Sequence, residues 1–114
     1  MSEVINPKSQ IVFIGLGRGG IRTLNLLEKH TDTDYVICDT DNFHLNRSNV
    51  ENKILLTYDL NSISQDSLNN FEKQMENRYI LFFVCSLGGK TGLETLPKLL
   101  AICKKLNKKT ICIL

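Results

Sequence analysis

The chain has 114 residues, the length of one ordinary domain, so a second domain would not fit. With 42% hydrophobic and 23% charged residues, its composition is that of a globular protein and excludes a disordered or fibrous chain. The net charge of +2 is too small to favour nucleic acid or an anionic membrane surface as a partner.

Short apolar runs alternate with segments of helical periodicity along the whole chain. Strands are predicted at residues 10–14, 35–38, 53–56, 79–85 and 110–114. Helices are predicted at residues 20–29, from Ser62 or Ser64 to about residue 77, and along a last apolar face that includes Leu96, Leu99 and Leu106. Pro97 should lie in the first turn of that last helix, where a missing N–H is tolerated.

The run 79–85 has no alternation of polar and apolar residues, which is typical of a central strand covered on both faces by helices. Right-handed crossovers then give a three-layer α/β sandwich with an open, parallel, five-stranded, Rossmann-like sheet. The expected strand order is 3-2-1-4-5, in one domain spanning residues 1–114. A ligand should bind beyond the carboxyl ends of strands one and four, where the strand order reverses.

The turn after the first strand contains the pattern G-x-G-x-x-G. Glycines let the backbone approach a phosphate, and the following helix presents unpaired N–H groups. The residues predicted to do this are Gly15, Gly17, Gly19 and Gly20, with Arg18 adding charge. The alternative is that the glycines serve only to pack the turn.

Asp39 and Asp41 follow the second strand, about 20 residues after the first turn, where a dinucleotide fold places an acid on a ribose hydroxyl. An Asp-x-Asp sequence at a strand end is also typical of a helix N-cap, and both interpretations stay open.

A second glycine-rich turn, residues 86–92, follows the central strand. It is a second candidate phosphate cradle, formed by Gly88, Gly89, Lys90, Thr91 and Gly92. It is not a P-loop, because the first glycine of that motif would fall at Val84.

Three stretches together resemble the nucleotide-binding half of the tubulin/FtsZ GTPases. They read I-G-L-G-R-G-G-I-R-T-L-N, C-D-T-D and L-G-G-K-T-G-L-E-T-L-P, and the FtsZ counterparts read roughly I-G-V-G-G-G-G-G-N-A-V-N, V-N-T-D and M-G-G-G-T-G-T-G-A-A-P. The resemblance covers residues 10–114 and corresponds to the first part of the family's GTPase domain.

The resemblance implies a GTP or GDP ligand, with Mg²⁺ accompanying the nucleotide, and a role in cell division. By the same resemblance, the residues around the phosphates are Gly17, Gly19, Gly20, Gly88, Gly89, Thr91 and Gly92. Asp41 would lie near the ribose or the rim of the phosphates.

The chain departs from the family motifs at several charged or bulky positions. Arg18 and Ile21 replace glycines and Arg22 replaces an asparagine. In the second motif Lys90, Leu93 and Glu94 replace Gly, Thr and Gly. We expect Arg18, Arg22 or Lys90 to add positive charge to the site.

We expect binding without hydrolysis by this chain alone, and no catalytic residue is assigned. Residues 57–61 do not contain the family's phosphate-sensing loop, and the sequence ends before the family's activating acidic loop. Phosphoryl transfer requires a positioned water, and no carboxylate or glutamine here takes that role.

Two other functions stay open. One is a non-enzymatic interaction module that self-associates or binds a protein through the face that polymerises in the family. The other, less favoured, is an NAD-binding Rossmann domain that uses Gly15, Gly17 and Gly20 with Asp39 or Asp41.

No apolar run is long enough to span a membrane, and residues 1–7 lack the features of a secretory signal, so we expect a cytoplasmic protein. The four cysteines are expected to be reduced core residues and not metal ligands: Cys38, Cys85, Cys103 and Cys112. His30 and His44 are expected on the surface or in loops.

Overall fold

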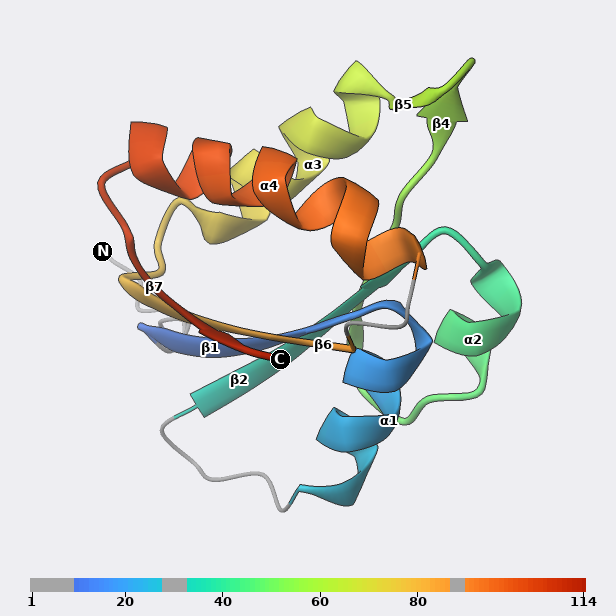
Figure 1. Cartoon of the computed structure of the whole chain (residues 1–114). Coiled ribbons are helices and arrows are strands. Elements are labelled where there is room, and N and C mark those ends of the chain that lie inside the picture. Colours follow the sequence, from blue (N-terminus) through green and yellow to red (C-terminus); the bar gives the residue numbers. More distant parts are fainter. Residues whose placement is uncertain (1–9, 28–32, 87–89) are drawn as a thin grey trace, which may run out of the picture.

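The computed structural model describes residues 10–27, 33–86 and 90–114. Five parallel strands form the central sheet: β1 (Ile11–Leu16), β2 (Thr33–Asp39), β3 (Asn52–Leu55), β6 (Ile80–Cys85) and β7 (Lys109–Ile113). Their order is β3-β2-β1-β6-β7 (Figure 1). This confirms the predicted order, with β6 and β7 as the fourth and fifth strands of the sheet.

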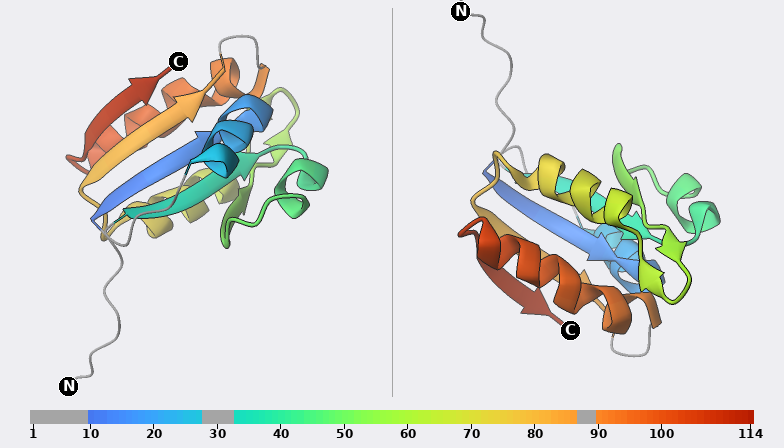
Figure 2. Two further views of the ribbon diagram at one scale, coloured as in Figure 1. Left: turned by 90° about the horizontal axis from the view of Figure 1, so that it is seen from below. Right: turned by 90° about the horizontal axis from the view of Figure 1, so that it is seen from above.

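Helices cover both faces of the sheet, as predicted. The helix α1 (Gly17–Leu26) lies on one face, whereas α3 (Gln65–Met75) and α4 (Lys90–Lys105) lie side by side on the other (Figure 2). Each face has its own buried cluster of apolar side chains. Phe83 belongs to the cluster under α3 and α4, and its neighbour Val84 belongs to the one under α1, so β6 is buried on both faces.

Of the two serines predicted to begin α3, Ser64 is the N-cap. Its Oγ accepts a hydrogen bond from the N–H of Ser67 at 3.1 Å, and Asp66 in the first turn complements the helix dipole. The apolar face of α3 buries Phe71 and Met75 completely.

Two helix boundaries differ from the prediction. The first helix begins at Gly17 instead of residue 20, because Gly17 takes a φ of 76° and turns the chain from strand directly into helix. The last helix begins at Lys90, so Pro97 lies inside it and not in its first turn. Pro97 is exposed, and its missing N–H removes a single bond from an otherwise regular helix.

The structure contains two small elements that the sequence analysis did not predict. One is α2 (Asn42–Asn46), beside the carboxyl end of β2, and the other is a hairpin of β4 (Tyr58–Asp59) and β5 (Ser62–Ile63). Both are too short to show a periodic pattern. The hairpin turns at Leu60, which has a φ of 58° and is 99% exposed.

We expect Leu60→Gly to stabilise the protein. A leucine in the left-handed region is strained, whereas glycine is not, so the free energy of unfolding should rise by roughly 0.5–1 kcal/mol. Thermal unfolding of Leu26→Gly is the matched control, because Leu26 is 87% exposed but helical, and glycine there should destabilise the chain. Equal effects of the two substitutions would contradict the assignment of strain to the hairpin turn.

Three cysteines are buried, as predicted: Cys38, Cys85 and Cys103. Burial raises the pKa of the Cys103 thiol to about 11. The prediction was wrong for Cys112, which is exposed because β7 is an edge strand and all of its residues are exposed. Within residues 10–27, 33–86 and 90–114, no helix is long and apolar enough to cross a membrane.

Candidate functional site

Two helices begin at the carboxyl ends of adjacent strands. Leu16 at the end of β1 is paired with Cys85 at the end of β6. The helix that follows β1 covers one face of the sheet, and the helix that follows β6 covers the other (Figure 1). This is the point where the strand order reverses, and it is where the sequence predicted a ligand.

The amino terminus of α1 has no side-chain cap among the described residues. The N-cap residue is Leu16, and its first turn contains no acidic side chain. The N–H groups of that turn therefore have no carboxylate or hydroxyl partner from the cap, and the positive end of the helix dipole is not neutralised. Such an end is suited to an anion.

Close packing explains why Gly20 is glycine. A Cβ atom at Gly20 would lie 2.1 Å from the carbonyl oxygen of Val84, so α1 rests directly on the backbone of β6. Gly15 and Gly19 are also in close contact, since added Cβ atoms would lie 2.8 Å from a Leu24 side-chain carbon and 2.5 Å from the Ser86 Cβ. The packing alternative therefore accounts for these three glycines, and their contact with phosphate stays a prediction.

The second glycine turn is described only in part. Gly88 and Gly89 lie outside the described residues, and α4 begins at Lys90, followed by Thr91. Gly92 is buried, and a Cβ atom there would lie 3.2 Å from the Cβ of Cys85. Here too the phosphate contact stays a prediction.

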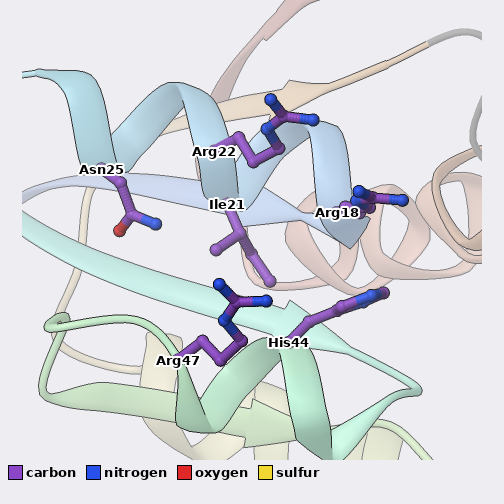
Figure 3. A pocket seen from close by; sticks show the side chains of 6 residues that line it. All are labelled: Arg18, Ile21, Arg22, Asn25, His44 and Arg47. Atoms are coloured by element: carbon purple, nitrogen blue, oxygen red, sulfur yellow. The ribbon is translucent and has the colours of Figure 1, made fainter.

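A cavity of about 350 Å³ lies between α1 and α2 (Figure 3). Its lining consists of Arg18, Ile21, Arg22, Asn25, His44 and Arg47. In Figure 3, Ile21 and Asn25 point from α1 toward α2, and the side chains of His44 in α2 and of Arg47 directly after it extend toward α1. Arg18 and Arg22 lie in a motif that the sequence shows, whereas His44 and Arg47 reach the cavity only through α2, which no periodic pattern predicts.

The cavity is positively charged. No Asp or Glu in the described part of the chain lies within 4.0 Å of the arginine side chains that line it, and Arg47 instead lies over the Phe43 ring at 5.3 Å. Three uncompensated guanidinium groups can bind the oxygens of a phosphate in a bidentate manner.

The two aspartates after β2 hold protein groups. Asp41 is the N-cap of α2 and accepts the N–H of Phe43 at 2.9 Å, so the capping interpretation is confirmed for this residue. Asp39 is 2% exposed and accepts Nδ1 of His44 at 2.7 Å. Burial is the main cause of the raised pKa of the neighbouring Cys38 thiol, and the charge of Asp39 raises that pKa further.

The sequence predicts a ribose contact for Asp39 and a surface or loop position for His44 and His30. The oxygens of Asp39 are engaged by protein donors, and its contact with a ribose stays a prediction. His44 lies on a helix, and its side chain is 29% exposed, so it is more enclosed than the surface or loop position expected for it. His30 lies outside the described residues.

Two curated relatives are similar to nearly the whole chain. The mitochondrial division protein fszB of Dictyostelium discoideum is 25% identical over 124 residues, which cover 97% of this chain and 34% of that protein. The cell division protein FtsZ of Rickettsia bellii is 27% identical over 124 residues, which cover 96% of this chain and 27% of that protein. No protein-family model matches the chain.

Solved FtsZ structures from M. jannaschii have the same arrangement of strands and helices. A point mutant superimposes with a TM-score of 0.82 at 25% identity, over 93% of this chain and 36% of that one. The resemblance to the tubulin/FtsZ family is confirmed. An empty FtsZ dimer gives a TM-score of 0.77 at 25% identity, over 92% of this chain and 35% of that one. The FtsZ-like chain thus spans about a third of the length of these relatives.

The structure describes the surroundings of two of the residues that separate this FtsZ-like chain from the quoted motifs, Ile21 and Glu94. Ile21 is 3% exposed and packs in the cluster under α1 while also lining the cavity. Glu94 is exposed in α4, beyond the first turn. The pKa of Tyr58 in the hairpin is raised mainly by the burial of Tyr58 and in addition by the charge of Glu94. Glu94 therefore lies near β4, which places the hairpin close to the start of α4.

Proposed function

We propose that the chain binds GTP or GDP as an FtsZ/tubulin-like module. The observation that carries this proposal is the uncapped start of α1 at the reversal of strand order, directly beside a cavity lined by three arginines. Arg18 belongs to both features, because it lies in the first turn of α1 and also lines the cavity. A polyphosphate on the first turn would therefore extend into positive surroundings.

The guanine base is part of the proposal through the family resemblance. The preference for a phosphate-rich ligand rests on the arginines and on α1. A magnesium ion would be held mainly by the phosphates, because the described residues contain no group of three or more His, Cys, Asp or Glu side chains that could hold a metal. We also propose that the chain binds the nucleotide without hydrolysing it by itself, since none of the residues that line the described cavity is a carboxylate or a glutamine that could position a water.

Both curated relatives are named for a role in division, and we extend that role to this chain as part of the proposal. A cytoplasmic location, and association with a second copy or a protein partner through the face that polymerises in the family, remain predictions. One of the matching solved structures is an FtsZ dimer.

A test is thermal unfolding of the chain with GTP, GDP, ATP and NAD in turn. A nucleotide at about 100 times its Kd should add about 2.7 kcal/mol to the free energy of unfolding, which is roughly a 10 °C rise in Tm. We expect that rise with GTP and GDP. A rise with NAD alone would overturn the proposal in favour of a dinucleotide-binding domain.

A second candidate function is the interaction module, which is favoured by the exposed edge of the sheet. The side chains of Ile111 and Ile113 in β7 are 47% and 46% exposed, and Leu114 is 64% exposed. An unprotected apolar edge strand can pair with another chain. No Tm shift with any of the nucleotides, together with a mass that rises with protein concentration, would favour this candidate over nucleotide binding.

A further inference from the structure

Asp39 at the end of β2 and His44 in α2 form a hydrogen-bonded pair. One oxygen of the buried Asp39 carboxylate accepts the N–H groups of Thr40 at 2.7 Å and Asp41 at 3.2 Å. The other oxygen lies 2.7 Å from Nδ1 of His44. Because a carboxylate accepts, Nδ1 of His44 carries the hydrogen, and this fixes both the tautomer and the orientation of the ring.

Nε2, the other nitrogen of the ring, makes no hydrogen bond within the described part of the chain, and an Asp41 carboxylate oxygen lies 3.7 Å from it. His44 lines the cavity between α1 and α2, and its side chain is 29% exposed, so it can be reached from that cavity. In the neutral ring Nε2 is an acceptor and repels a phosphate oxygen. In the protonated ring Nε2 is a donor and attracts a phosphate oxygen.

We propose that His44 is a ligand-binding residue of the cavity, whose Nε2–H binds a phosphate oxygen while Asp39 holds Nδ1. Binding by the neutral protein then takes up one proton from solvent, and that proton bonds to Nε2. This inference rests on the proposed function, and it adds a residue that the family resemblance does not supply. It also gives a reason for Asp39, which stands where the FtsZ motif quoted above has asparagine.

Charged side chains of both signs surround the His44 ring. Two carboxylates lie against the ring, that of Asp39 from β2 and that of Asp41 before α2. Three arginines line the same cavity as the ring: Arg18 and Arg22 on α1, and Arg47 at the C-cap of α2. The one charged residue of β3, Lys53, does not line the cavity.

An incoming phosphate offsets the arginines and adds negative charge beside the ring, so the bound state holds the extra proton more firmly. Affinity for a phosphate ligand should therefore rise as the pH falls and the ring takes up its proton. The ligand's own phosphate also titrates near this range, but it contributes equally to every variant of the protein.

The experiment is isothermal titration calorimetry with GDP and, separately, with inorganic pyrophosphate, at pH 6 and pH 8. Each titration is run in two buffers of different ionisation enthalpy, which counts the protons taken up. We expect the intact chain to bind about tenfold more tightly at pH 6 than His44→Gln does, and to take up more protons. His30→Gln removes the other histidine and should behave like the intact chain.

The outcomes separate this inference from the proposed function. If His44→Gln keeps the affinity and proton uptake of the intact chain, the role of His44 is overturned while nucleotide binding stands. If pyrophosphate binds with proton uptake through His44 but GDP does not bind, the anion site stands and the nucleotide proposal fails. If neither GDP nor pyrophosphate binds, the role of His44 and the proposed function are both overturned.

If the His44→Gln variant does not fold, NMR spectroscopy of the intact chain tests the role of His44 instead. In the intact chain, the ring-proton NMR signals of His44 should move toward the protonated position when pyrophosphate is added at pH 7. Signals that do not move, at saturating pyrophosphate, would overturn the inference.

Discussion

Gly20→Ala should destabilise the protein by about 3 kcal/mol, a fall in Tm of roughly 10 °C. The added methyl group would lie 2.1 Å from the carbonyl oxygen of Val84, and neither partner is a flexible side chain that could move aside. The helix α1 would have to shift away from β6, which would loosen the cluster around Ile21 and Leu24.

Helix propensity alone predicts the opposite sign for this substitution. Replacing glycine by alanine in a helix normally stabilises the protein by roughly 0.5–1 kcal/mol. Arg22→Ala, at an exposed position on the same helix, is the control and should change stability by about 0.5 kcal/mol or less. An increase in Tm for Gly20→Ala would show that α1 does not rest on the backbone of β6.

Arg18→Glu should weaken nucleotide binding by about 100-fold or more without unfolding the chain. A hydrogen bond between charged groups contributes about 1.5–3 kcal/mol, and the substitution replaces it with repulsion of the phosphates. The same glutamate lies in the first turn of α1, where it should stabilise the helix dipole by about 0.3–1 kcal/mol. Stability and binding are therefore expected to change in opposite directions.

Lys98→Glu makes the same change of charge at an exposed position of α4 that does not line the cavity. At physiological salt its distant charge is largely screened, so binding should be nearly unaffected. Thermal unfolding and GDP titration of both variants check the prediction. Equal losses of affinity in the two would indicate a response to net charge and would remove Arg18 from the site.

Much of the fold could be predicted because the central strands of the sheet are buried on both faces. The uninterrupted apolar run that ends at Cys85 identifies β6 as a central strand, and the glycine turns after β1 and β6 mark the carboxyl edge. The limits of α1 and α4 could not be read in the same way. They depend on the positive φ of Gly17 and on tertiary packing that keeps Pro97 within a helix.

The site was predicted less completely than the fold. Arg18 and Arg22 lie in a recognisable motif, but His44 and Arg47 reach the cavity only because α2 forms. That helix has five residues and no apolar period, so its main signal is the cap at Asp41. The glycines show a second limit, since the same residue type is required by a phosphate cradle and by backbone contact such as that of Gly20.

Direct titration of the intact chain with GDP by calorimetry tests whether the site at the start of α1 holds a nucleotide. We expect saturable binding at one site per chain, with the affinity lost in Arg18→Glu and kept in Lys98→Glu. Absence of any binding heat at millimolar GDP in buffers of different ionisation enthalpy, together with an unchanged Tm, would contradict it.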